Sequence, residues 1–239
     1  MAGPIIELDF KGEIQGKRYV SGSYRRNRAK LERMIKEEPQ AEYYLMLAVL
    51  EVRKHYWNRA HQAVEKALTL APDYKEAHLL YAQILEAKQE LVEAARAYQA
   101  TLHRFPQFSK AYREYARYLM THTDSITLAQ SLLLKSLELD PKDALSHILI
   151  AEICLLRGKT GQALLHFELA QHYYLDHPRF HQGKARLFME MERYEEAAKH
   201  LKLAMRLDPK NKVLRNQFAQ ALKATNTPKI FLFWKRWVI

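Results

Sequence analysis

The sequence predicts an all-α fold built as a stack of about five helix pairs. Five alanines recur at intervals of 34, 35, 34 and 34 residues: Ala60, Ala94, Ala129, Ala163 and Ala197. Between them, apolar residues recur at helical spacing. Glycine (7) and proline (8) are too scarce for a turn-rich β architecture. A fixed period of this length indicates stacked repeats, in which each helix pair buries its apolar face against its neighbours.

In each repeat, the sequence pattern predicts a first helix and a second helix that cross at small residues. A further alanine stands twelve residues before four of the five, as Ala48, Ala82, Ala151 and Ala185, whereas Ala116 stands thirteen before Ala129. The third repeat therefore carries one inserted residue. A large side chain follows each second-helix alanine by four residues, as Val64, Tyr98, Leu133, Phe167 and Leu201. Proline then ends most second helices, as Pro72, Pro106, Pro141 and Pro209, with Leu175 in the fourth repeat.

This pattern resembles the tetratricopeptide repeat over about residues 41–222. The best matches run from Ala48 to Pro72 and from Ala185 to Pro209. The resemblance implies a right-handed superhelical solenoid of about five helix pairs whose first helices line a concave, peptide-binding groove. The family's usual glycine is alanine throughout, and its early tryptophan is replaced by Tyr44, His78, Tyr112 or Arg113, His147 and His181.

The predicted organisation has nine parts. An extended basic arm (1–24) and an unpaired helix (25–40) precede repeats at 41–74, 75–108, 109–143, 144–177 and 178–211; a capping helix (212–224) and an aromatic, basic tail (225–239) follow. Asp73, Ser109 and Asp143 stand where first helices begin and are expected to cap them.

The resemblance also places the residues that would contact a partner. The groove positions lie three residues before, one after and four after each crossing alanine. The predicted contacts are Leu45, Val49, Val52, Leu79, Gln83, Arg113, Arg117, Met120, Glu152, Gln182 and Arg186, with Lys110 and Arg179 one turn earlier. Glu86, Ile148, Leu155 and Met189 occupy groove positions as well. The chaperone-tail ligand of the family is set aside, because Leu45 and Val49 replace the lysine and asparagine that it requires.

Arg113 and Arg117 are neighbours on one helix face. Two adjacent guanidinium groups suit a carboxylate or a phosphate, so the predicted partner is an extended or helical, acidic and apolar peptide. The alternative is a solvated surface whose side-chain stems pack on tyrosines.

Catalytic, metal and cofactor sites are not predicted. The chain has no glycine-rich phosphate loop, nucleophile elbow or paired-carboxylate motif, so we expect no enzyme activity and no cofactor. His177 and His181 are separated by a predicted helix start at Pro178, which argues against a metal site. The single cysteine, Cys154, is expected to be a small buried apolar side chain, and it fits a reducing, cytoplasmic location.

The charge is concentrated at the two ends. The net charge is +11; residues 1–36 carry nine Lys/Arg against four Asp/Glu, and residues 199–239 carry ten against one, so the middle is net −3. The tail is expected to contact an anionic membrane surface through Phe231, Phe233, Trp234, Lys235, Arg236 and Trp237. Two alternatives stay open: the tail covers the last helix pair, or it begins a spanning helix.

Together these features predict a non-catalytic scaffold or adaptor that binds a protein partner, in the cytoplasm or held at a membrane. The alternative is a nucleic-acid-associated protein that binds through its basic ends, which the acidic middle disfavours. Self-association through the ends of the stack is a third possibility.

Overall fold

The computed structural model describes residues 13–14, 17–18, 24–173 and 177–225, and these residues form twelve α-helices and one two-stranded antiparallel sheet. The strands are β1 (Glu13–Ile14) and β2 (Lys17–Arg18). The prediction of an all-α repeat fold is confirmed. The chain divides into two compact units, Met1–Thr123 and Asp124–Ile239, called here the N-terminal and C-terminal units.

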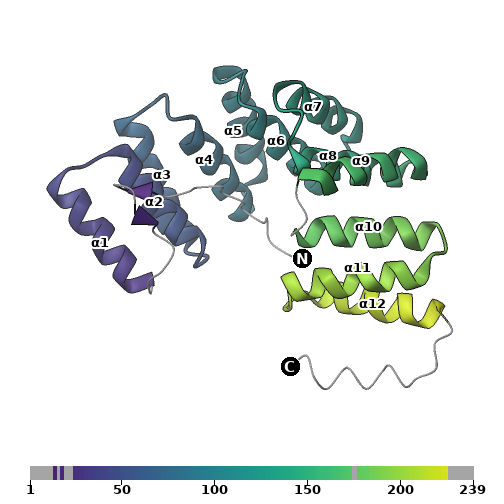
Figure 1. Ribbon diagram of the computed structural model, residues 1–239. Helices are drawn as coiled ribbons and strands as arrows, with labels where there is room; N and C mark the ends of the chain where they lie inside the picture. The colour runs from purple at the N-terminus through teal and green to yellow at the C-terminus, as the bar shows by residue number, and fades with distance from the viewer. Residues whose placement is uncertain (1–12, 15–16, 19–23, 174–176, 226–239) are drawn as a thin grey trace. The chain divides into compact units, whose positions relative to one another are not determined.

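The N-terminal unit contains six helices (Figure 1). They are α1 (Tyr24–Glu37), α2 (Ala41–Val52), α3 (Trp57–Leu70), α4 (Lys75–Ala87), α5 (Leu91–Arg104) and α6 (Ser109–His122). Within this unit each helix packs on the next one in sequence. The helix α1 packs on α2 through Leu31 and Met46, which are both buried.

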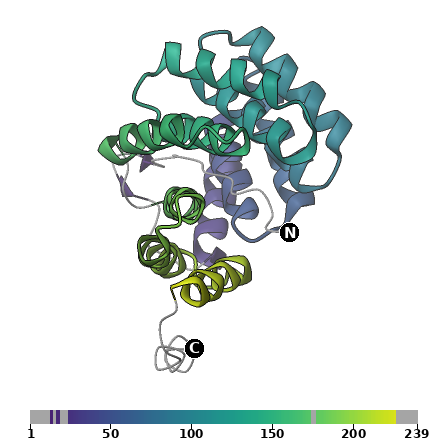
Figure 2. The ribbon, with the colours of Figure 1, turned by 90° about the vertical axis from the view of Figure 1, so that its right-hand side faces the viewer.

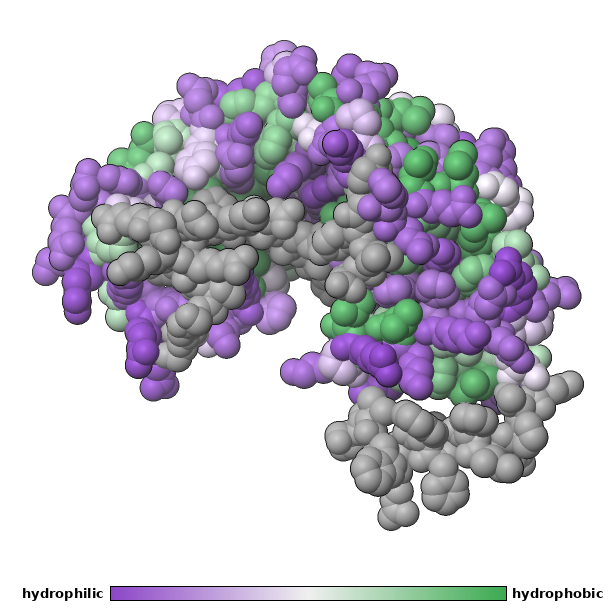
Figure 3. Space-filling view, viewed as in Figure 1, coloured by the Kyte–Doolittle hydropathy of each residue, from purple (hydrophilic) through white to green (hydrophobic). Residues whose placement is uncertain are grey.

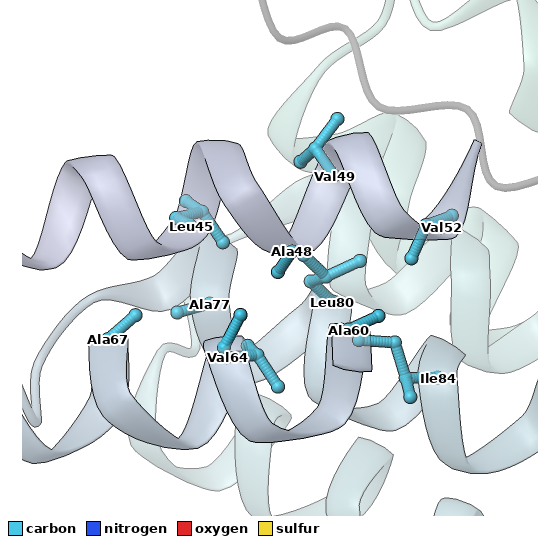
Figure 4. Close-up of a cluster of buried hydrophobic side chains, with 11 residues drawn as sticks. Leu45, Ala48, Val49, Val52, Ala60, Val64, Ala67, Ala77, Leu80 and Ile84 are labelled. Carbon is cyan, nitrogen blue, oxygen red and sulfur yellow. The ribbon is translucent and has the colours of Figure 1, made fainter. Parts of the chain in front are cut away.

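The core of the N-terminal unit forms around the small residues that the repeat predicts. Ala48 of α2 and Ala60 of α3 are fully buried, as is Val64 one turn after Ala60. Figure 4 shows Ala48 on the side of α2 that faces α3, with Leu80 of α4 beside it and Ile84 beside Ala60, and Val49 on the opposite side of α2. Because alanine has almost no side chain, the two helices can approach closely and larger apolar residues fill the space around the crossing.

The C-terminal unit also contains six helices. They are α7 (Ile126–Leu139), α8 (Ala144–Leu156), α9 (Thr160–Tyr173), α10 (Pro178–Glu190), α11 (Tyr194–Leu207) and α12 (Lys212–Ala224). The last three are successive neighbours, and Figure 2 views α10 and α11 nearly end-on. Their core gathers around Ala185, Ala197 and Leu201.

One contact in this unit joins a very large residue to a very small one. A Cβ atom at Gly183 of α10 would lie 2.7 Å from the Cζ atom of Phe167, a fully buried ring on α9. Real Cβ atoms do not approach this closely, so the glycine makes room for the ring.

The turns within four of the five helix pairs share one backbone feature. His55, Gln89, Gly158 and Glu192 have φ values of 59, 65, 68 and 58°. The next residue donates its N–H to the carbonyl five residues earlier, for example Tyr56 to Glu51 at 3.0 Å. This is the hydrogen bond of a Schellman motif, which ends the first helix. The third pair, where the sequence has its inserted residue, lacks such a positive φ between α6 and α7.

The position of the family's early tryptophan has a defined role in this chain. His78, Tyr112 and His147 each donate a hydrogen bond to the carbonyl of the proline six residues earlier, at 2.7, 3.2 and 3.2 Å. Arg215 does the same to Pro209 at 2.6 Å. A polar donor therefore closes the end of the preceding second helix, and Tyr112, rather than Arg113, occupies this position in the third repeat.

The predicted side-chain caps are not formed at the first helices. Tyr74 and Phe108 are the N-cap residues of α4 and α6, and Asp143, which does precede α8, forms no capping hydrogen bond with its side chain. Asp73 instead accepts two hydrogen bonds from Arg104, at 2.5 and 3.0 Å. The capping prediction was wrong for Asp73 and Ser109, because both lie one residue away from the N-cap position.

Apolar side chains also reach the surface on several second helices. Leu165, Leu169 and Leu203 are 55%, 37% and 38% exposed. On the face shown in Figure 3 such residues form patches between hydrophilic ones.

Candidate protein-binding site

Most predicted groove positions of the N-terminal unit are buried. Leu45 is fully covered, and Val49, Val52 and Leu79 are each less than a tenth exposed. Gln83 is also buried, and its Oε1 atom has no hydrogen-bond partner. Lys110 and Met120 are partly exposed.

Arg113 and Arg117 are buried as well, and they bind carboxylates of the same chain. The Arg117 guanidinium donates to both oxygens of Glu86, at 2.9 and 2.5 Å, and its Nε atom donates to Glu114 at 2.9 Å. Arg113 donates to the other oxygen of Glu114 at 3.1 Å. All four residues are buried. The sequence predicted a pair that grips a partner's acid, and the structure instead shows each guanidinium bound to an acid of its own fold.

Glu86 collects further donors in addition to Arg117. The Tyr98 hydroxyl donates to its Oε2 atom at 2.8 Å, and the His122 Nε2 atom lies 3.0 Å from its Oε1 atom. The Tyr98 ring packs against both Tyr115 and Tyr118, with ring centroids 5.6 and 5.4 Å away. The carboxylate is thus surrounded by hydrogen-bond donors in an aromatic environment.

The electrostatics of this cluster keep its groups in fixed protonation states. Burial raises the pKa of the Tyr98 hydroxyl well above its usual value, so Tyr98 stays a donor. Burial opposes the charges of Arg117 and Glu114, but their opposite charges outweigh it: the pKa of Arg117 is raised and that of Glu114 is lowered. The cluster is therefore charge-paired at neutral pH.

The C-terminal unit presents its predicted groove positions differently. Ile148 and Leu155 of α8 are buried, but the polar residues around them reach solvent. Arg179 of α10 donates two hydrogen bonds to Glu152 of α8, at 2.7 and 2.6 Å, in a partly exposed pair. Gln182 donates to Gln217 of α12 at 3.1 Å.

Arg186 lies one turn after Gln182 on α10 and is exposed. Its guanidinium takes part in no hydrogen bond or ion pair with another residue in the part of the chain that the structure describes. Arg186 is thus an exposed predicted contact whose hydrogen-bonding capacity remains available to a partner.

The histidines of the C-terminal unit form pairs rather than metal clusters. The Nδ1 atoms of His147 and His166 lie 3.1 Å apart, and those of His181 and His200 lie 3.0 Å apart. The Nε2 atom of His147 donates to the Pro141 carbonyl, so its Nδ1 atom can accept the hydrogen bond from His166. The Nδ1 atom of His177 accepts from the backbone N–H of Arg179 at the start of α10. No group of three or more His, Cys, Asp or Glu suited to a metal ion occurs among the described residues.

Two segments of the chain match family models described as tetratricopeptide repeat, at residues 45–109 and 178–211. These two segments are tetratricopeptide repeats. Human tetratricopeptide repeat protein 21A is 38% identical to it over 82 residues, which make up 33% of this chain and only 6% of the human protein. The repeat chain thus corresponds to a small part of that relative's length.

Solved structures support the fold of the tetratricopeptide-repeat chain. The TPR protein TTC0263 from Thermus thermophilus has a TM-score of 0.65 at 22% identity, over 77% of this chain and 99% of that chain. The APC/C hetero-tetramer of Cut9 and Hcn1 gives a TM-score of 0.76 at 17% identity, over 84% of this chain and 41% of the matched chain.

The repeat register explains the contrast between the two arginines. Arg117 and Arg186 occupy the same position of the tetratricopeptide repeat, one residue after the crossing alanine. Arg117 pairs with Glu86, which lies 31 residues earlier. The residue 31 before Arg186 is Leu155, which has no group to accept a hydrogen bond. Aligning the repeats on each other could have revealed this difference.

The membrane prediction lies outside the described residues. Phe231, Phe233, Trp234, Lys235, Arg236 and Trp237 all belong to the segment beyond residue 225. None of the described helices of this repeat protein is long and apolar enough to cross a bilayer.

Proposed function

We propose that this chain is a non-catalytic, cytoplasmic scaffold that binds an acidic segment of a protein partner through α10 of its C-terminal unit. Tetratricopeptide-repeat proteins bind other proteins, and one of the matched chains is part of the APC/C hetero-tetramer Cut9–Hcn1. The observation that carries the proposal is the exposed Arg186 guanidinium, which has no acidic partner on its own chain among the described residues.

The neighbours of Arg186 suit an extended peptide. Gln182, one turn earlier, has donors and acceptors that can bind a peptide backbone. It would have to break one hydrogen bond, to Gln217, to do so. Arg179 adds a second cation that is already partly balanced by Glu152. Met189, partly exposed at the next turn, offers an apolar contact. This combination favours a segment with a carboxylate near the centre and an apolar residue beside it.

The test is selection of binders from a phage-displayed library of random dodecapeptides, with the full chain as bait. The selected peptides should be enriched in Asp and Glu. Arg186→Glu should weaken their binding by about tenfold or more, because a charge-assisted hydrogen bond is replaced by repulsion. Lys223→Glu is the matched control, since Lys223 is an exposed cation on α12. Acidic peptides that bind Arg186→Glu as tightly as the parent chain would refute the proposed site.

The tail prediction has a separate test. We propose that residues 229–239 hold the scaffold at an anionic membrane surface, on the strength of their aromatic and basic composition. The full chain should sediment with phosphatidylserine vesicles at low salt, and a chain ending at Thr227 should not. Equal binding of the two chains would remove the membrane contact from the proposal and leave the partner site untouched.

A further inference from the structure

A second surface with binding chemistry lies in the N-terminal unit, at the turn between α2 and α3. The seven residues Arg53–Arg59 include three cations, one histidine and two aromatic residues. All of them except Trp57 are exposed. None occupies a predicted groove position, so the proposed function does not use them.

The turn forms one wall of a cavity of about 530 Å³. His55, Tyr56, Trp57 and Arg59 line it from this side, and Lys88, in the corresponding turn after α4, lines it from the other. The left-handed backbone of His55 and the hydrogen bond from Tyr56 to Glu51 fix the shape of the first turn. The cavity therefore belongs to the folded helix pairs rather than to a loose loop.

The aromatic rings of the turn organise its cations. The Arg59 guanidinium lies 5.1 Å from the centre of the Tyr56 ring, and the Lys54 ammonium lies 5.9 Å from the centre of the Tyr24 ring. His55 packs edge-on against Trp57, with ring centroids 5.3 Å apart. A guanidinium that rests on a ring keeps its N–H edge free to donate to a carboxylate.

The carboxylates near this turn are already occupied. Glu51 is buried and accepts from the Tyr24 hydroxyl, at 2.8 and 3.0 Å. Glu90 pairs with Lys88 at 2.7 Å. Arg53, Lys54 and Arg59 form no ion pair with any residue that the structure describes. A positive charge thus remains unbalanced beside a cavity lined by aromatic rings.

We propose that this cavity is a docking site for an acidic peptide segment that carries one aromatic side chain. The ring of the peptide enters the cavity between Trp57 and Lys88, and its flanking carboxylates meet Arg59 and Lys54. A peptide is favoured over a single-stranded nucleic acid because the site is one short, open hollow at a single turn, whereas nucleic-acid strands need a continuous basic track with successive stacking rings. The site is independent of α10, so either site can exist without the other.

The test uses a fluorescein-labelled peptide with one phenylalanine flanked on each side by three acidic residues, measured by fluorescence anisotropy with the full chain. Binding by the parent chain should be saturable below 1 mM. Arg59→Glu should weaken it about tenfold or more, and Arg59→Lys should weaken it less, because lysine keeps the charge but loses the paired N–H donors. A peptide with alanine in place of phenylalanine should bind about tenfold more weakly than the original.

Three controls separate the outcomes. Lys159→Glu makes the same charge change in the corresponding turn of the fourth repeat and should leave affinity within twofold. Arg186→Glu should also have no effect, which separates this site from the proposed partner site. Absence of saturable binding, or equal binding by Arg59→Glu, overturns the proposal. So does tighter, Arg59-dependent binding of an oligothymidylate, which would assign the cavity to nucleic acid.

Discussion

Arg117 and Arg186 have the same place in their repeats but opposite surroundings. Arg117 is buried and shares Glu86 and Glu114 with Arg113. Arg186 is exposed, and Leu155 stands where the preceding repeat would need an acid to pair with it. The comparison shows that the position within the repeat decides which face of the helix a side chain is on. The preceding repeat decides whether its charge is paired within the chain or available to a partner.

The largest expected effect is on stability in the N-terminal unit. Arg117→Leu removes the main cation from Glu86 and leaves a buried carboxylate with the Tyr98 hydroxyl and the His122 ring as its remaining hydrogen-bond partners. The free energy of unfolding should fall by about 3–5 kcal/mol, as for other broken buried pairs. Urea unfolding followed by circular dichroism measures the loss.

Arg186→Leu is the matched variant and should change the unfolding free energy by no more than about 0.5 kcal/mol, as is usual for exposed positions. If Arg117→Leu does not fold, Arg117→Lys keeps the charge and should fold with a smaller loss. Equal losses of unfolding free energy for the Arg117 and Arg186 variants would show that the two arginines do not differ in their pairing.

A second prediction concerns a substitution that should give Arg186 an acidic partner on its own chain. Leu155→Glu places a carboxylate 31 residues before Arg186, as Glu86 is placed before Arg117. The substitution should cost about 1–3 kcal/mol less in the parent chain than in the Arg186→Leu background, since only the parent can pair the new charge. A double-mutant cycle in urea measures this coupling.

The same substitution should act on binding. Peptides selected on α10 should bind Leu155→Glu about tenfold more weakly, because Arg186 would already be engaged by its own chain. Zero coupling in the cycle, together with unchanged peptide affinity, would show that the 31-residue register does not control the availability of Arg186.

The fold could be predicted from sequence because its determinants are short-range. The crossing alanines Ala48 and Ala185 are buried as their size and period require. Helix ends follow from proline and from the turn residues, although Asp73 shows that a cap cannot be located to the residue. The insertion before Ala129 left the choice between Tyr112 and Arg113 open, and the hydrogen bond of Tyr112 to Pro106 decides it.

The binding site was harder to predict because availability is a long-range property. The sequence shows that Arg113 and Arg117 are adjacent on one helix. Whether they are paired depends on Glu114, which lies between them, and on Glu86, which comes from another helix. One side of the cavity beside Arg59 is formed by Lys88 of the next turn, so the basic and aromatic residues Arg53–Arg59 do not by themselves predict a cavity. Groups brought together by stacking are found only when successive repeats are compared.

The smallest expected effect concerns how the two units respond to acid. The N-terminal cluster is held by opposite charges, whereas the Nδ1 atoms of His181 and His200 in the C-terminal unit lie 3.0 Å apart, at hydrogen-bond distance. Burial, Lys184 and His181 lower the pKa of His200 to about 4. The unfolded chain, with a histidine pKa of about 6.5, therefore binds a proton before the folded chain does.

The contribution of His200 to stability should be complete above about pH 6.5 and should be lost as the pH falls from there to about 4, with no further loss below that. Allowing for the partial exposure of the ring, the loss should be on the order of 1–2 kcal/mol. His200→Asn keeps a hydrogen-bonding atom near the position of Nδ1 but does not titrate. Urea midpoints measured from pH 7 to pH 4 should fall less for this variant than for the parent chain. Parallel curves for the two chains would show that His200 does not contribute to the pH dependence of stability.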